Sequence, residues 1–367
     1  MNKKFTPKIL IKYLVKEFSI SLIIFFSIFL SLIVLTNFIE EIFFLREKKI
    51  DESLFFKTFT LSIMKTPTIL INMSPFIFLF SGIFYYVKLL RSNEVMPLSL
   101  SGFSKNFVTL VPSFFSLFLG IMLITVITPI SSELSKQYET IKQKYISNDN
   151  LIIMSDTGLW VKDRQDSNTF IVRADRIEND NFNNLSNIII YKFENNGDLI
   201  ERIEGDSAII ENEKWKIKNG KKLENNTNVN LGDFDYTTNI NLGKLKNFFI
   251  NPNTFSIWNI NKELKQIRER GYFGQELVIT YHKYLSLPFV LFSMVILATF
   301  FTLKVNLKFN NFVYTFFGVL FGILIYFLLD LSIAIGKSGK VPLIMSVWIP
   351  VISMLLISYY SLLKENE

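Results

Sequence analysis

The chain has no cysteine and a single histidine, and these absences exclude several kinds of site. Without thiols it can form neither a disulfide framework nor a thiolate centre, and one imidazole cannot build a His-rich metal site. Alanine is absent before Ala174, so the basic, apolar N-terminal segment contains no A-x-A cleavage site. This segment therefore predicts an uncleaved membrane anchor rather than a signal peptide.

Motifs for nucleotide binding and hydrolysis are missing as well. Gly336-Lys337-Ser338 resembles the end of a phosphate-binding loop, but Leu331 occupies the position where that loop requires glycine. The G-x-S-x-G, H-E-x-x-H and paired-cysteine patterns do not occur. We expect no cofactor, no metal and no catalytic residues.

What the chain does contain is apolar sequence of membrane length. Half of its 367 residues are hydrophobic, 38 are Phe, and the mean hydropathy is +0.32. A helix needs about 20 apolar residues to cross the ~30 Å hydrocarbon core of a bilayer. Six runs reach this length, and they cover residues 18–38, 66–88, 107–129, 284–303, 311–334 and 343–363.

A polar, Asn-rich region separates the third run from the fourth. Residues 131–280 hold 20 Lys/Arg and 22 Asp/Glu, whereas the rest of the chain holds 19 and 10. The overall charge of +7 therefore belongs to the membrane portion, which indicates basic membrane flanks rather than nucleic-acid binding.

Strand patterns fill this central region. Short β-branched, alternating segments are separated by turn signals at Asn195-Asn196-Gly197-Asp198, Asn219-Gly220 and Gly232-Asp233. They predict strands at 151–161, 169–177, 185–194, 199–204 and 206–217. An antiparallel sandwich or open barrel of the jelly-roll kind follows from this spacing. A return helix is expected at 255–273, with Gly271 as its stop.

The fold class is therefore an α-helical membrane protein, three helices plus three, with an inserted all-β domain. The divisions fall at 1–130, 131–275 and 276–367. The short segments on the N-terminal side hold 11 Lys/Arg against eight on the other side. This bias predicts that both termini are cytoplasmic and that the central domain lies outside.

Several residues within the spans attract attention. Pro67 and Pro75 predict bends in the second span, either as tolerated kinks or to widen a cavity. Gly318 and Gly322 form a G-x-x-x-G that allows close helix approach, to a partner subunit or within the chain. Asp330 is an acid in an apolar run and is expected to be an anchor that Lys337 or Lys340 could meet; a proton relay is the alternative. His282 is expected to be an interfacial residue beside Lys283.

The inner face of the central domain is a second candidate site. Apolar positions in its strands include Ile188, Ile190, Ile209 and Trp215. They form either an ordinary core or a surface that accepts lipid tails.

Short motifs along the whole chain, taken in order, resemble the lipopolysaccharide-export permease family (YjgP/YjgQ, LptF/LptG). Leu90-Arg91-Ser92-Asn93-Glu94, followed by Ser101-Gly102-Phe103-Ser104, looks like the family's cytoplasmic coupling segment, here at about 89–105. Ser99 and Pro97 depart from its usual pattern. Further matches are Gly197-Asp198-Leu199, Glu213-Lys214-Trp215-Lys216-Ile217, the run from His282 to Pro288, and Gly336, Pro342, Trp348 and Pro350. Gly158-Leu159-Trp160 and the Trp-Ile-Pro ending favour the LptG-like member.

This resemblance implies a subunit of an ABC-type exporter in the bacterial inner membrane, with its central domain periplasmic. Arg91, Glu94 and Gly102 would couple it to a separate cytoplasmic ATPase dimer. A second homologous permease would complete a heterodimer, and a single-span protein with a β domain would extend the path for lipopolysaccharide.

Three other functions remain open on the sequence alone. One is a membrane enzyme that modifies envelope lipid, although the acids among the strands are scattered. Another is the membrane subunit of a different ABC system, such as lipoprotein release. The third is a structural scaffold without transport.

Overall fold

The computed structural model describes residues 8–47, 54–100, 103–146, 151–155, 158–165, 168–177, 184–194, 198–211, 214–224, 227–237, 251–269, 274–302 and 311–364. The chain divides into two compact units. The first, which we name the membrane unit, comprises residues up to Ser135 and from Ile279 onward. The second, the β unit, runs from Lys136 to Val278.

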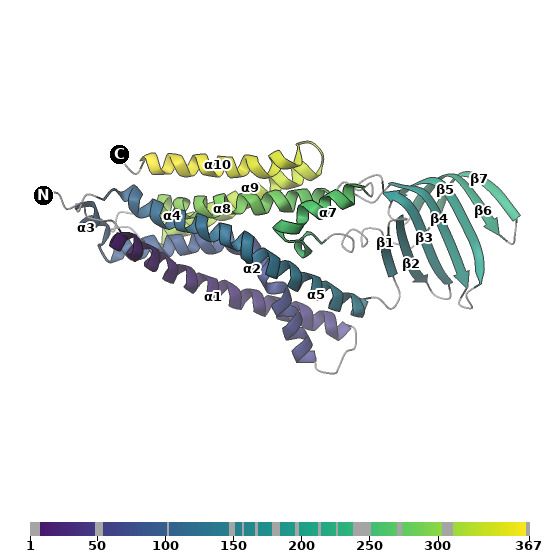
Figure 1. Cartoon of the computed structure of the whole chain (residues 1–367), viewed down its shortest axis with the longest axis horizontal. Helices are drawn as coiled ribbons and strands as arrows, with labels where there is room; N and C mark the ends of the chain where they lie inside the picture. The colour runs from purple at the N-terminus through teal and green to yellow at the C-terminus, as the bar shows by residue number, and fades with distance from the viewer. Residues whose placement is uncertain are drawn as a thin grey trace. The chain divides into compact units, whose positions relative to one another are not determined.

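Six helices are long and apolar enough to cross a membrane, as the sequence predicted (Figure 1). The first two are α1 (Lys8–Glu47) and α2 (Leu54–Arg91). The third is continuous through α4 (Lys105–Met122), the π-helical turn η1 (Leu123–Ile127) and α5 (Thr128–Ile146). The last three are α8 (Gln275–Thr302), α9 (Asn311–Lys337) and α10 (Leu343–Lys364). A short helix, α3 (Val95–Leu100), connects α2 to α4.

Small residues bring these helices into close contact. A Cβ atom added to Gly120 in α4 would lie 2.7 Å from Cα of Pro288 in α8. A Cβ atom on Gly82 in α2 would lie 2.8 Å from Cβ of Ala298 in the same helix α8. Because apolar side chains gain little from leaving lipid for a helix interface, such close packing provides much of the attraction between membrane helices.

The β unit contains one antiparallel sheet in which the strands follow one another in sequence order (Figure 1). The strands are β1 (Leu151–Ser155), β2 (Gly158–Gln165), β3 (Asn168–Ile177), β4 (Asn184–Glu194), β5 (Leu199–Glu211), β6 (Lys214–Glu224) and β7 (Thr227–Thr237). The unit also holds the 3₁₀ turn η2 (Pro252–Thr254) and the return helix α7 (Ile257–Glu269). The helical membrane protein with an inserted β domain is confirmed. The strand order is that of a meander, without the Greek-key crossovers of a jelly roll.

Two of the expected turns are in fact bulges inside strands. Asn219 in β6 and Gly232 in β7 have φ angles of 52° and 67°. The register between β6 and β7 shifts on both sides of Gly220. A left-handed backbone conformation favours Asn or Gly in a bulge as much as in a turn, so both features have the same sequence signal. This explains why β7 was not predicted. The predicted strand 199–204 and the first part of 206–217 together form β5, and the last part of 206–217 lies in β6.

The bulges of β6 and β7 continue into β3, β4 and β5 as a row of positions where the ladder is interrupted, which we name the bulge row. Asn187 in β4 donates to Oδ2 of Asp175 in β3 at 3.2 Å, and Asn219 donates to Oδ2 of Asp206 in β5 at 2.8 Å. The backbone N–H of Asn219 donates to Oδ1 of Asp233 in β7 at 3.0 Å. At this row the buried positions are three residues apart instead of two: 185 and 188, 205 and 208, and 217 and 220. One face of the sheet thus stays apolar although the alternation is interrupted.

That face carries a single buried cluster. Its members come from both sides of the bulge row, and they are Val172, Ala174, Leu185, Ile188, Ile190, Ile203, Ala208, Ile210, Trp215 and Ile217. A flat sheet cannot bury these residues on its own. We infer that the sheet bends along the row, so that the residues on its two sides close around the cluster.

Candidate functional site

The expected coupling segment begins at a well-formed helix end. The N–H of Glu94 donates to the carbonyl of Leu89 at 3.1 Å, and the N–H of Asn93 donates to that of Leu90, also at 3.1 Å. Asn93 has a φ of 55°, so these bonds form a Schellman cap on α2. Arg91 is exposed in the last turn of α2, and Gly102 lies outside the described residues.

Glu94 is held by the first helix of the chain. Its Oε2 accepts a hydrogen bond of 2.5 Å from the hydroxyl of Tyr13 in α1. Nearby, Glu17 of α1 pairs with Lys88 of α2 at 2.5 Å. Sequence reasoning missed Tyr13, because nothing in the local pattern of α1 distinguishes it from an interfacial tyrosine.

The prolines and glycines of the spans lie within the membrane unit. Pro67 and Pro75 are both inside α2, which continues past them. Gly318 and Gly322 are buried in α9, and a Cβ atom on Gly322 would collide with the side chain of Leu79 in α2. At Gly322 the close approach is therefore made within this chain.

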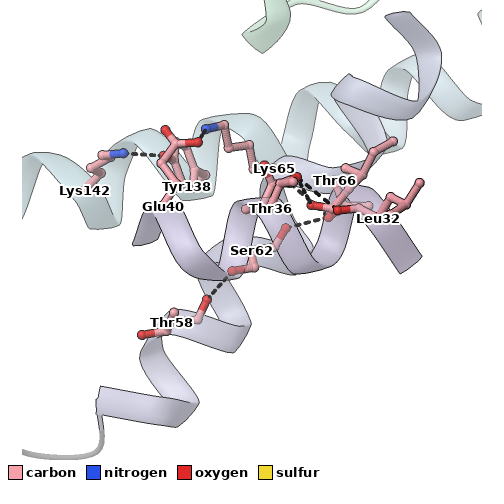
Figure 2. A network of polar contacts seen from close by, with 11 residues as sticks. Leu32, Thr36, Glu40, Thr58, Ser62, Lys65, Thr66, Tyr138 and Lys142 are labelled. Atoms are coloured by element: carbon pink, nitrogen blue, oxygen red, sulfur yellow. Dashed lines mark hydrogen bonds and ion pairs between the residues drawn. The ribbon is translucent and has the colours of Figure 1, made fainter. Parts of the chain in front are cut away.

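Sequence reasoning also missed a polar network between the C-terminal part of α1 and the N-terminal part of α2 (Figure 2). Lys65 forms an ion pair with Glu40 at 2.7 Å, and buried Asn37 donates to the hydroxyl of Thr66 at 3.3 Å. In Figure 2, the hydroxyl of Thr66 bonds back to the carbonyl of Ser62, and Ser62 bonds back to Thr58. The only available signal was the occurrence of Ser, Thr and Asn inside an apolar run.

Buried hydroxyl groups also join the second span to the third. The hydroxyl of Thr68 lies 2.8 Å from those of Ser131 and Ser135 in α5. All three residues are buried. Hydrogen bonds between helices fix their rotation about their axes, and here they fix α5 against α2 next to Pro67.

Two ionisable residues of the last three spans, Asp330 and His282, have partners within the chain. Asp330 in α9 pairs with Lys283 in α8 at 3.4 Å, a cation other than the Lys337 or Lys340 that the sequence suggested. The two residues are neighbours only after folding. The Nε1–H of Trp348 donates to Nδ1 of His282 at 3.3 Å, so His282 packs against α10 rather than standing alone at an interface.

The inner-face residues of the β unit divide into two groups. Ile188, Ile190 and Trp215 are at most 1% exposed and belong to the buried cluster. Ile209 does not belong to it, and its prediction as an inner-face residue is wrong. Its neighbours Ala208 and Ile210 point inward instead, because the bulge row shifts the alternation of β5 by one residue.

No arrangement for catalysis is apparent in the parts of the chain that are described. They contain no group of three or more His, Cys, Asp or Glu residues that could hold a metal ion. Several of the described acids of the β unit take part in the bulge row or in ion pairs such as Arg202 with Glu204. The geometry is that of a helix bundle with an antiparallel β sheet that has one apolar face.

Comparison with known proteins agrees with this geometry. No curated protein matches the chain. The family model described as lipopolysaccharide export system permease LptF/LptG matches residues 12–364, which include both units. Its members are membrane subunits of a transporter and not enzymes, so the lipid-modifying enzyme is set aside. The chain belongs to the LptF/LptG family of permeases of the lipopolysaccharide export system.

Proposed function

We propose that this chain is one half of a permease pair that extracts lipopolysaccharide from the bacterial inner membrane and passes it to a periplasmic β scaffold. A second homologous subunit completes the pair. A cytoplasmic ATPase dimer drives it, and a single-span protein with its own β domain continues the path. Both termini are cytoplasmic, and the β unit is periplasmic. The basic N-terminal segment before the first apolar run supports this orientation.

The energetics explain why such partners are required. Burial in the bilayer is worth ~0.8 kcal/mol for each CH₂ group of a lipid chain. Removing a lipid with several chains therefore costs on the order of tens of kcal/mol. Because the sequence contains no nucleotide-binding motif, a separate ATPase must supply this work, and an apolar surface outside the bilayer must reduce the cost.

The observation that carries the proposal is the open sheet with one continuous apolar face. Its end strands β1 and β7 are not hydrogen-bonded to each other. The sheet is therefore not closed into a barrel. Because the strands run through both halves of the bent sheet, the halves can part by straightening along the bulge row, without breaking the hydrogen bonds between strands. Phe170, Phe234 and Tyr236 lie partly buried at the margin of the cluster, and Val229 is 48% exposed on β7. The cluster is covered while the two halves lie together. Lipid tails enter between the halves when they part.

Photo-crosslinking tests this path. Phe234 packs against the apolar cluster, whereas Phe193 stacks on Tyr191, which alternates with the buried Ile190 on β4. At either position, a benzophenone amino acid exchanges the Phe ring for another aromatic side chain. We expect ATP-dependent lipopolysaccharide adducts from position 234 and none from 193. Equal labelling at both positions, or none at 234, would leave the β unit as a packed recruitment domain.

Glu94 is the proposed contact with the ATPase. It lies in the segment that resembles the coupling segment, and truncating one partner of a desolvated ion pair costs about 2–5 kcal/mol. We expect Glu94→Ala to weaken copurification of the ATPase or to uncouple hydrolysis from export. Normal assembly and coupling in this variant would remove the assignment.

A further inference from the structure

The hydrogen bond between Tyr13 and Glu94 joins two parts of the chain that have different tasks. Tyr13 lies near the start of α1, the first membrane helix, whereas Glu94 stands between α2 and α3. The carbonyl of Glu94 accepts a hydrogen bond from the N–H of Leu98 in α3 at 3.3 Å. Glu94 is thus a pivot to which α1, α2 and α3 are all bonded.

The surroundings of this bond are rigid. Phe18 of α1 is fully buried and makes an edge contact with Tyr85 of α2, at 5.8 Å between ring centroids. Leu14, one turn from Phe18, is also fully buried. Packing of Leu14 and Phe18 therefore holds this part of α1, and Tyr13 with it, beside α2, while the Schellman cap fixes the backbone of Glu94. The hydrogen bond from the Tyr13 hydroxyl to the Glu94 carboxylate then links the side chains of these two residues.

Among the described residues, no ion pair joins a cation to Glu94. Of the two cations in the last turn of α2, Lys88 is engaged by Glu17 at 2.5 Å, and Arg91 is exposed. Tyr13 is a neutral donor, and it occupies only Oε2. A carboxylate has about four acceptor positions on its two oxygens, so Oε1 can still accept from a guanidinium or ammonium group. Glu94 is partly exposed, so such a group can reach it.

We propose that Tyr13 is a positioning residue for coupling. It orients Glu94 toward a cationic side chain of the ATPase and connects α1 mechanically to the coupling segment, so that a displacement of α3 is transmitted to the first span. This inference rests on the proposed function, in which Glu94 meets the ATPase. The Glu17–Lys88 pair keeps the adjoining turns of α1 and α2 together while Glu94 changes partner.

The test uses the full chain purified with its partners and returned to lipid vesicles. The variants are Tyr13→Phe, Glu94→Ala and the two combined, with Tyr360→Phe on the exposed face of α10 as the matched control. Copurified ATPase, ATP turnover and lipopolysaccharide released per ATP are measured. Hydrogen bonds to charged groups are stronger than those between neutral groups, so we expect Tyr13→Phe to lower release per ATP by roughly tenfold.

The combined variant separates positioning from ordinary packing. If Tyr13 acts through Glu94, the double variant is no worse than Glu94→Ala, and the ATPase still copurifies with Tyr13→Phe to within about twofold. Additive losses, or an unchanged release per ATP in Tyr13→Phe, would overturn the proposal while leaving the function intact. A wild-type chain that binds no ATPase would overturn the proposed function and the coupling role together.

Discussion

Gly322 in α9 leaves the space that the side chain of Leu79 in α2 occupies, because a Cβ atom there would overlap Cδ2 of that leucine. Leu79 is itself only 1% exposed. The contact joins a helix of the second half of the chain to one of the first half. Both helices therefore depend on the absence of a side chain at one position.

Substitutions at Gly322 should accordingly lower stability, and a change at Leu79 should restore it. Overpacking costs roughly 1–3 kcal/mol, so Gly322→Ala should lower the thermal unfolding temperature of the detergent-solubilised chain. Combining it with Leu79→Ala should recover part of the loss. A glycine that instead faced a partner permease would show no rescue by Leu79→Ala.

Neutralising Asp330 should have little effect. Its ion pair with Lys283 is long, at 3.4 Å, and both side chains are well exposed in the unit. Exposed pairs contribute about 0–1 kcal/mol. We expect Asp330→Asn to retain transport and unfold within a few degrees of the wild type. Loss of transport with unchanged stability would instead indicate a proton relay.

Asn187 should tolerate glycine better than valine. Its φ of 49° is left-handed, which costs a residue other than Gly, Asn or Asp about 1–2 kcal/mol. Asn187→Val should therefore increase cleavage of the β unit in pulse proteolysis of the full chain. Asn187→Gly keeps the backbone and loses only the amide bond to Asp175, so it serves as the control. The reverse ranking would mean that the amide, and not the φ angle, stabilises the bulge row.

The β unit should lose stability in strong alkali through Tyr236. Burial raises the pKa of this phenol to about 12, and the carboxylate of Glu201 adds to the rise. The ordinary value is about 10, so the neutral phenol stabilises the fold fully below pH ~10, and this contribution is lost as the pH rises through 12. In a titration followed by absorbance at 295 nm, Tyr236→Phe should remove one of the late-titrating tyrosines of the wild-type chain. If the tyrosine lost in Tyr236→Phe is instead one that titrates near pH 10, Tyr236 is in contact with solvent.

The membrane part of the fold could be predicted from the sequence because hydropathy acts locally. A run of about 20 apolar residues spans a bilayer whatever its neighbours are, so all six spans were predicted. The strands β3 and β4 were likewise predicted within a residue, because β-branched alternation is read over a few positions. The short motifs gave the family, which the match over residues 12–364 confirmed.

Only the tertiary structure decided which residues meet. Asn219-Gly220 reads equally as a turn or a bulge, and the choice depends on pairing with β7, as does the bend that buries the cluster. Ile209 was assigned to the wrong face because the alternation of β5 shifts by one residue between Gly205 and Ala208. Tyr13 and Glu94 are 81 residues apart. Their bond forms because packing of α1 on α2 brings them together, and no local sequence pattern encodes that distance.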